Sequence, residues 1–372
     1  MKILFLYTEL AGYFLACVEA LIRNHDTEVM IFRWPVNPEA PFDFRFPEGV
    51  QVRQRAGLSW QEVYAAGSDF EPDLVFMTGW IDKGYMRAAR QFRRKGIPVI
   101  AGLDNQWTGS IKQRLATWIS PLYLHRHIDY LWVAGIRQYE YARRLGFAHD
   151  RIRLGYYSAD VALFFFEGLK YLEEKSRNYP HNLLYVGRLM EHKGIEELCR
   201  AFLETSDSHD WTLTLVGKGE VEAGLLQTGR ILVRAFVQPE KLPELAATAG
   251  AFVLPSRHEP WGVVLHEFAA AGLPLIASDA CGAGDAFLRD GYNGFRHRAA
   301  DPESLRTAIL RITRCPDAAL HQMGIRSAEL AKQITPQSWA ATLVGVGRGK
   351  TGDGRRKTAS LTEERWKSGN KN

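Results

Sequence analysis

Cysteine is scarce in this sequence, and long apolar stretches are missing. Its 372 residues include four cysteines, none in a Cys-x-x-Cys pair or at the spacing of zinc ligands, so we expect free thiols in a reducing compartment. No apolar run reaches the roughly 20 residues that a transmembrane helix requires. The first residues imitate a signal peptide, but Glu9 interrupts their apolar run, which favours a buried first strand. We therefore expect a cytoplasmic protein.

The chain also has no large excess of charge of one sign. Its net charge is +5, and residues 348–372 alone hold eight Lys or Arg against three Asp or Glu, which equals that excess. A nucleic-acid-binding domain would carry a basic surface on its folded body, so we expect no nucleic acid partner. Residues 345–372 are rich in Gly, Lys and Arg and have little to bury, which predicts a basic, disordered tail.

Several catalytic and metal-binding motifs are absent. The sequence has no GxSxG, HExxH or DxD motif, and its eleven histidines do not cluster at the spacing of metal ligands, so we expect no metal and no cofactor. GVGRGKT near the end resembles a phosphate loop, but Val344 stands where that loop needs its first glycine. CGAGD at 281–285 lacks the third glycine of a dinucleotide-binding turn. Neither segment predicts nucleotide hydrolysis or nicotinamide binding.

The residues that are present alternate between short apolar runs and helix-like segments. Short apolar strands separated by helices form parallel sheets covered on both faces, so the fold class is α/β. In the first half we expect strands at 3–7, 28–32, 74–78, 98–101 and 131–134, and helices at 13–23 and 83–95. In the second half we expect strands at 183–186, 213–216, 231–234, 251–254 and 275–278, and helices at 194–203, 242–248, 263–271 and 303–314. Two Rossmann-like domains follow, at 1–155 and 181–335, with a linker at 156–180.

The segment Leu183–Phe202 has the pattern of an anion site. A strand ends at Val186, Gly187 permits a tight exit, and Arg188 and Lys193 flank a short loop before a helix. Two cations and a helix amino terminus beside the carboxyl end of a strand attract a diphosphate. The alternative is a solvated loop with ordinary surface charges.

The segment Phe252–Ser278 places two carboxylates around a second helix start. Glu259 precedes the helix, where it can accept hydrogen bonds from the hydroxyls of a bound sugar, and Gly262, Val263 and Val264 present backbone amides to an anion. Glu267 lies in an otherwise apolar helix, where a carboxylate is costly without partners, and a ribose diol would supply them. The alternatives are that Glu259 caps the helix and that Glu267 is a surface residue.

The second half resembles the retaining glycosyltransferases of family 4 (glycosyl transferases group 1), which have the GT-B fold. Four motifs carry the resemblance, in this order: VGRL…KG, LxLVGxG, FVLPSxxEPWGxVxxE and AxGLPLIAS. The resemblance covers about residues 183–339. It implies two Rossmann-like parallel-sheet domains facing a central cleft, with the acceptor bound by the first domain and a nucleotide-sugar donor by the second. It also implies that residues 336–344 form a closing helix that returns to the first domain.

The resemblance implies a role for each matching residue. Arg188 and Lys193 would hold the donor diphosphate, Glu259 would contact the donor sugar, and Glu267 would contact the ribose. The remaining positions implied at the donor site are Gly12, Gly187, Gly217, Val237, Gln238, Gly262, Val263 and Val264. The chain departs from the family in one place, because Asp104 or Asn105 occupies the strand end where many relatives have histidine. Both side chains are short and polar, so we expect them to contact a sugar or the acceptor, but the details of acceptor recognition cannot be carried over from the family.

The expected reaction is the transfer of a sugar from a nucleotide diphosphate sugar to an acceptor hydroxyl with retention of configuration and without metal. The acceptor would be a glycan or a lipid-linked compound in cell-envelope or surface polysaccharide synthesis. The alternatives are a sugar-nucleotide epimerase, a phosphorylase and a nonenzymatic nucleotide-sugar-binding protein, and a further one is a basic tail that docks on nucleic acid. Residues 85–95 and 111–127 mix basic and aromatic residues, which suggests contact with an anionic membrane. The alternative there is a solvated helix face over core aromatics.

Overall fold

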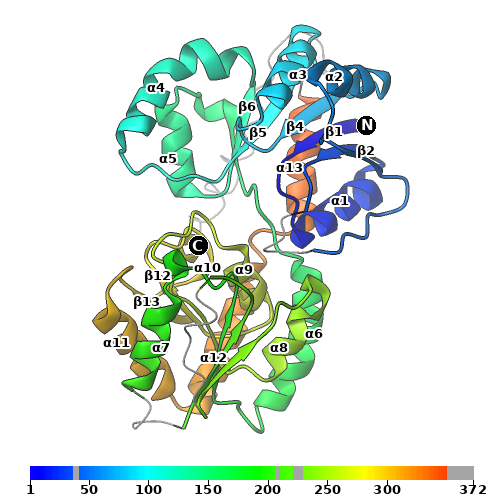
Figure 1. Cartoon of the computed structure of the whole chain (residues 1–372). Coiled ribbons are helices and arrows are strands. Elements are labelled where there is room, and N and C mark those ends of the chain that lie inside the picture. Colours follow the sequence, from blue (N-terminus) through cyan, green and yellow to red (C-terminus); the bar gives the residue numbers. More distant parts are fainter. Residues whose placement is uncertain (37–41, 206–209, 221–228, 350–372) are drawn as a thin grey trace, which may run out of the picture.

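Two α/β domains lie end to end with a cleft between them (Figure 1). This computed structural model describes residues 1–36, 42–205, 210–220 and 229–349. The GT-B arrangement predicted from the sequence, with two parallel-sheet domains facing a central cleft, is confirmed.

The first domain is built on a seven-stranded parallel sheet with the strand order β3-β2-β1-β4-β5-β6-β7. Its strands are β1 (Lys2–Tyr7), β2 (Glu28–Arg33), β3 (Gln51–Gln54), β4 (Leu74–Met77), β5 (Val99–Leu103), β6 (Tyr130–Val133) and β7 (Ile152–Leu154). Its helices are α1 (Gly12–His25), α2 (Trp60–Asp69), α3 (Lys83–Arg94), α4 (Ile111–Tyr123) and α5 (Ile136–Arg144).

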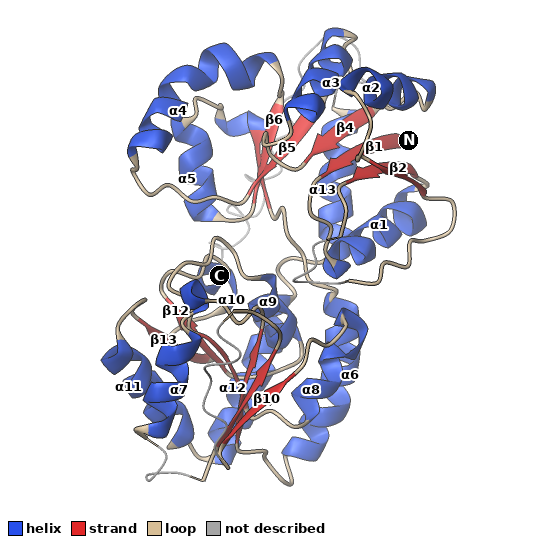
Figure 2. Cartoon of the chain, viewed as in Figure 1, coloured by secondary structure: helices blue, strands red, loops and turns tan. Residues whose placement is uncertain are grey.

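The second domain has a six-stranded parallel sheet with the order β10-β9-β8-β11-β12-β13. Its strands are β8 (Asn182–Val186), β9 (Thr212–Val216), β10 (Ile231–Arg234), β11 (Ala251–Leu254), β12 (Leu275–Ser278) and β13 (Gly294–His297). Its helices are α6 (Val161–Lys175), α7 (Ile195–Leu203), α8 (Leu242–Ala247), α9 (Val263–Ala270), α10 (Gly284–Phe287), α11 (Pro302–Thr313) and α12 (Asp317–Ala331). Figure 2 shows the helices of both domains packed on the two faces of their sheets.

Both sheets change strand order at one point, between β1 and β4 and between β8 and β11. In open α/β sheets, ligands bind outside the carboxyl ends of the strands at such a switch point. Both switch points face the cleft, because the cavity between the domains is lined by residues that follow β1 and β8. The topology therefore positions one site between the two domains.

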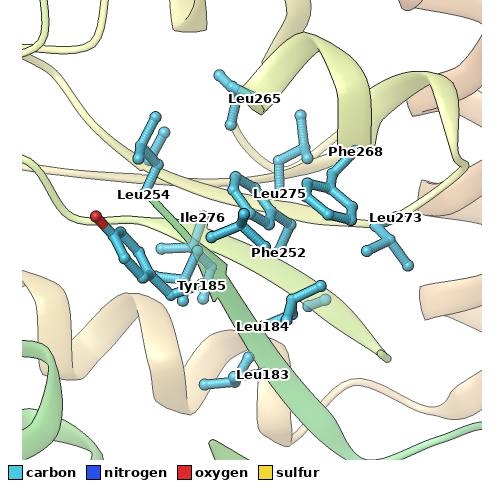
Figure 3. Packing of buried hydrophobic residues seen from close by; sticks show 14 of the residues in the cluster. Leu183, Leu184, Tyr185, Phe252, Leu254, Leu265, Phe268, Leu273, Leu275 and Ile276 are labelled. Atoms are coloured by element: carbon cyan, nitrogen blue, oxygen red, sulfur yellow. The ribbon is translucent and has the colours of Figure 1, made fainter. Parts of the chain in front are cut away.

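The central strands are buried on both faces, which explains their continuous apolar sequence. All the residues of β4, β5, β11 and β12 are buried. In the second domain, Phe252 of β11 stacks on Phe268 of α9 with ring centroids 4.5 Å apart, and Figure 3 shows this pair among the leucines of β8 and β12. Burial of these side chains stabilises the fold by about 1.5–3 kcal/mol each.

The segment 156–180, expected as a linker, contains helix α6. This helix packs against α8, α9 and α12, so it belongs to the second domain. The sequence did not suggest a helix because aromatic residues and charges mask its period; its Phe166 is exposed while Phe164 is buried. The irregular connection between the domains is restricted to the residues before Val161.

The chain returns to the first domain through α13 (Pro336–Arg348), which packs against α1 (Figure 1). Trp339 is buried there, where its ring lies 4.7 Å from Trp132 and its indole N–H donates to the carbonyl of Tyr156 at 2.7 Å. The helix expected at 336–344 runs on to Arg348, so the first residues of the predicted tail are helical. Residues 350–372 of that tail lie outside the described residues.

Candidate active site in the interdomain cleft

A cavity of about 970 Å³ lies between the two domains. Of the site residues predicted from the sequence, the structure places the following in its lining: Gly12, Asp104, Asn105, Gly187, Arg188, Lys193, Gly217, Val237, Glu259, Gly262, Val263, Val264 and Glu267. Gln238 is not in the lining; its side-chain oxygen accepts a hydrogen bond from the backbone of Asp43, 3.3 Å away.

Lys193 and Glu259 form the most buried ion pair of the site. The ammonium donates to the Glu259 carboxylate at 2.5 Å, and the two side chains are 14% and 11% exposed. Ser256 donates a second hydrogen bond to the same oxygen at 3.2 Å. Lys193 ends a short 3-10 turn, and Gly194, with φ of 70°, connects this turn to α7. A side chain at Gly194 would collide with the carbonyl oxygen of Pro255. Glu259 therefore does not cap α9.

The amino terminus of α9 faces the cavity. Its first residue is preceded by Gly262, which has φ of 93°, and no side chain caps the helix. The first amides of a helix lack acceptors within it, so Val263 and Val264, which line the cavity, offer N–H donors to an anion. A side chain at Gly262 would press on Glu259 and Cys281, so this position requires glycine.

Glu267 is buried in the second turn of α9 and lines the cavity, so it is not a surface residue. Burial, and then the nearby Asp160 carboxylate, raise the pKa of Glu267 to about 7. Its neighbour His266 fixes the helix: the imidazole accepts from the amide of Ala159 and hydrogen-bonds the carbonyl of Ala331, and burial lowers its pKa to about 4. The neutral ring thereby connects α9 to the two segments through which the chain passes between the domains.

The glycines at the strand ends allow close backbone contact. A side chain at Gly217 would collide with the carbonyl oxygen of Gly187, so the loops after β8 and β9 meet at the cavity. Gly12, at the start of α1, lies against Pro239 of the second domain, where a β-carbon would come within 2.8 Å of that ring. Arg188 lines the same edge and is exposed.

The first domain contributes a layer of tyrosines to the cavity. Tyr7, Tyr13, Tyr156 and Tyr157 all line it, and burial raises the pKa of each hydroxyl, so they remain neutral. The hydroxyl of Tyr157 donates to the carboxylate of Asp104 at 3.1 Å. Asp104, which stands near the place of the family's histidine, is thus held on the cavity wall, while Asn105 is exposed beside it.

A contact across the cleft that the sequence did not suggest begins at α5. Arg137 donates to both oxygens of Asp285, at 2.5 and 2.9 Å, and to the carbonyl of Asp279 at 2.8 Å. Burial by itself would raise the pKa of Asp285, but hydrogen bonds from Arg137 and Arg296 hold that pKa below its usual value. The adjacent Gln138 is fully buried and donates to the carbonyl of Pro260 at 2.7 Å. CGAGD at 281–285 therefore forms one half of an interdomain contact.

Comparison with known proteins agrees with this geometry. Residues 180–314 match the family model described as "Glycosyl transferases group 1". The chain is 32% identical over 180 residues to a glycogen synthase of Mycobacterium tuberculosis, which covers 46% of this chain and 43% of the relative. It is 32% identical over 137 residues to the lipopolysaccharide core biosynthesis glycosyltransferase LpsE of Rhizobium meliloti, covering 35% and 38%. The chain thus spans less than half the length of these relatives.

Solved structures are similar along nearly the whole chain. A sucrose-phosphate synthase from Thermosynechococcus elongatus superposes with a TM-score of 0.73 at 20% identity, covering 94% of this chain and 98% of that one. HepE of Anabaena, solved in complex with UDP-glucose, gives a TM-score of 0.68 at 16% identity, covering 93% and 99%. The fold and site therefore define a protein of the GT-B class. Its second domain is similar to glycosyl transferases group 1 domains.

Proposed function

We propose that this protein is a retaining glycosyltransferase that moves a sugar from a nucleoside diphosphate sugar to an acceptor hydroxyl. The observation that carries the proposal is the convergence of Lys193, Glu259, Glu267 and the amino terminus of α9 on one cavity. Lys193 and the helix amides would bind the diphosphate. The two carboxylates would accept hydrogen bonds from the hydroxyls of the sugar and the ribose.

In the proposed reaction, the bond between the anomeric carbon and the donor diphosphate breaks, and a bond to the acceptor oxygen forms on the same face of the sugar. The proton of the acceptor hydroxyl passes to the leaving diphosphate, so no protein base is required. Negative charge grows on the leaving group, where Lys193, Arg188 and the amides of Val263 and Val264 stabilise it. Preorganised donors of this kind are usually the largest catalytic contribution. We propose on this ground that the reaction needs no metal.

The donor contacts follow from the same geometry. Glu259 would accept hydrogen bonds from hydroxyls of the donor sugar, and Glu267 would accept two from the ribose diol. Val237 would border the base, and Gly12 would let the first domain approach the donor. Asp104 and the tyrosine layer would face the acceptor, because they line the opposite wall of the cavity.

A turnover assay tests this proposal. The full-length protein is incubated with UDP-, GDP-, ADP- and dTDP-sugars and a panel of glycan acceptors, and the nucleoside diphosphate released and the anomeric configuration of the product are measured. We expect a retained glycoside from the wild type and from the exposed control Glu329→Gln, and little product from Glu259→Gln. An epimerised but intact donor, release that requires phosphate as the acceptor, or tight donor binding without turnover would contradict it.

We further propose that the first domain contacts an anionic membrane and that the acceptor is a glycan or lipid-linked compound of the cell envelope. On α4, Ile111, Trp118 and Leu122 are 86%, 81% and 68% exposed, and the helix carries Lys112 and Arg114 without any acidic residue. An apolar stripe beside basic residues suits an anionic lipid surface. On α3, in contrast, Tyr85 and Phe92 are buried, so its aromatics belong to the core. Among the described helices, none is long and apolar enough to cross a bilayer.

Vesicle flotation tests the membrane proposal. We expect the protein to float with phosphatidylglycerol vesicles at low salt, and the double variant Trp118→Ser/Leu122→Ser to remain in solution. Phe166→Ser is the matched control, because Phe166 is 65% exposed but lies on α6 of the other domain. Equal flotation of all three proteins, or no flotation of the wild type, would contradict this proposal.

A further inference from the structure

Two cations of the cavity lining, Arg33 and Lys218, have no role in the proposed donor site. The cavity lining includes Arg33, Arg188, Lys193 and Lys218, and among the described residues Arg33 is the one Lys or Arg that the first domain contributes. It is the last residue of β2 and lies on the wall of the cavity opposite Lys193. The donor diphosphate would be neutralised on the other side, so Arg33 is available for a different anion.

The guanidinium of Arg33 packs against aromatic rings, and two of its three nitrogens lack hydrogen-bond partners among the described residues. Its Nε and Nη1 atoms are buried and have no hydrogen-bond partner among the described residues. The guanidinium lies 5.4 Å from the ring centroid of Phe44 and 5.9 Å from that of Phe46. Two aromatic rings fix its position but satisfy none of its N–H groups, and a buried donor without a partner is destabilising.

No carboxylate among the described residues accepts a hydrogen bond from the buried Nε or Nη1 of Arg33. Asp82 is already engaged, because it accepts hydrogen bonds from Arg55, from the indole of Trp34 and from two backbone amides. Asp104 accepts a hydrogen bond from Tyr157 at 3.1 Å. Glu9 lines the same end of the cavity but is exposed. Arg33 therefore presents a positive charge, partly shielded from water, to the acceptor end of the cleft.

We propose that Arg33 recognises an oxyanion, a phosphate or carboxylate group, carried by the acceptor. Arginine attracts such groups through its positive charge and its N–H donors, and the attraction is stronger where water is excluded. The side chains of Trp34 and Phe44, which also line this end, offer flat apolar surfaces to a sugar ring. The inference rests on the proposed function and specifies its substrate class: the acceptor is an acidic compound, and Arg33 selects it.

Binding of matched ligands tests the proposal. With the donor site saturated by the nucleoside diphosphate that the protein prefers, titration calorimetry compares glucose with glucose 6-phosphate, glucuronate, inorganic phosphate and short-chain phosphatidic acid. We expect at least one anion to bind about tenfold or more tightly than glucose, and Arg33→Met to abolish that preference. The anion that binds best distinguishes a soluble acidic sugar from a lipid phosphate. Arg45→Met, an exposed arginine nearby, is the control that retains the preference.

The melting temperature separates this role from a structural one. Because Arg33→Met removes N–H groups that have no partner, we expect its Tm to equal or exceed that of the wild type. Binding of none of the anions above the level of glucose, an unchanged anion preference in Arg33→Met, or a lowered Tm together with proportional loss of all ligands overturns the proposal. Failure of every nucleoside diphosphate to bind would instead contradict the proposed function, because that step precedes the anion titration.

Discussion

The two walls of the cleft are built differently. The wall from the second domain consists of loops at the ends of β8, β9 and β11, where Gly187, Gly217 and Gly262 allow backbone and ligand groups to come close. The wall from the first domain is rich in aromatic side chains, among them Trp34, Phe44 and Tyr157, and also carries Asp104 and Arg33. Backbone geometry restricts residue choice and leaves sequence motifs, whereas aromatic packing permits many substitutions. The comparison explains why the donor side is recognisable in sequence and the acceptor side is not.

The largest effect is expected on the wall of the second domain. Lys193→Ala removes a cation from the proposed leaving group and leaves Glu259 buried without its partner, so we expect kcat to fall by about 10²–10³. Steady-state kinetics of nucleoside diphosphate release measures it. Lys332→Ala is the control, since that lysine pairs with Glu329 on an exposed helix surface. A fall in kcat of less than threefold would show that Lys193 is not a catalytic residue.

Asp104→Asn tests the opposite wall. This change keeps the shape of the side chain and its acceptor oxygen for Tyr157 but removes the charge. We expect KM for the acceptor to rise about tenfold, while KM for the donor and nucleotide affinity stay unchanged, because the residue lies on the wall of the first domain. Substrate-dependence curves for both substrates measure the effect. A rise confined to the donor KM would place the donor sugar against the first domain instead.

A pH series on Glu267→Gln sharpens the donor assignment. The folded-state pKa of Glu267 is raised from 4.5 to about 7, so its contribution to stability is fully present below pH 4.5 and is lost as pH rises through 7. We expect the Tm of Glu267→Gln to equal that of the wild type near pH 4.5 and to exceed it at pH 8.

Nucleotide binding should show the opposite trend. Because the ribose diol needs the ionised carboxylate as acceptor, the affinity of the wild type for a nucleoside diphosphate should rise between pH 6 and 8, and that of the variant should stay flat and low. Thermal melts from pH 4.5 to 8 and calorimetry from pH 6 to 8 measure the two trends, with Glu244→Gln as an exposed control. Parallel pH profiles for wild type and Glu267→Gln would exclude the carboxylate from the nucleotide site.

The smallest effect is expected at the contact that joins the two walls. Arg137→Met removes the bidentate pair with Asp285, whose side chains are 27% and 29% exposed and so partly screened by solvent. We expect the free energy that favours domain closure to fall by about 1 kcal/mol. This should raise KM for both substrates about fivefold, with a smaller change in kcat. Arg144→Met is the control, because Arg144 pairs with Glu140 within α5. A change in one KM alone would argue against a role in closure.

Much of the fold could be predicted from the sequence. The central strands are apolar throughout because helices cover both faces, and every strand expected from this pattern is present. The edge strands β3 and β7 were missed because they are largely exposed and lack that apolar pattern. Strand β13 was missed because Phe295 is its only large apolar residue. Helices α2, α5, α10 and α12 were missed as well, although α12 packs against α9.

The site was predictable only where local geometry dictates it. Lys193 and Glu259 could be inferred from their places beside strand ends and helix starts. Arg137 and Asp285 are 148 residues apart and belong to no motif, so their pairing appears only when the domains are placed together. Arg33 looks like any charged residue at the end of a strand, because its distinguishing feature, N–H groups without partners, depends on the surrounding packing.

The central claim is that the wall of the second domain binds a nucleoside diphosphate through Glu267. The most direct measurement is a thermal-shift panel of UDP, GDP, ADP, dTDP and NAD on the full chain and on Glu267→Gln. A ligand at 100 times its dissociation constant stabilises by about 2.7 kcal/mol, which moves the melt by several degrees. We predict that one nucleoside diphosphate shifts the wild type and that Glu267→Gln loses the shift. A shift by NAD alone, or one that Glu267→Gln retains in full, would contradict the account.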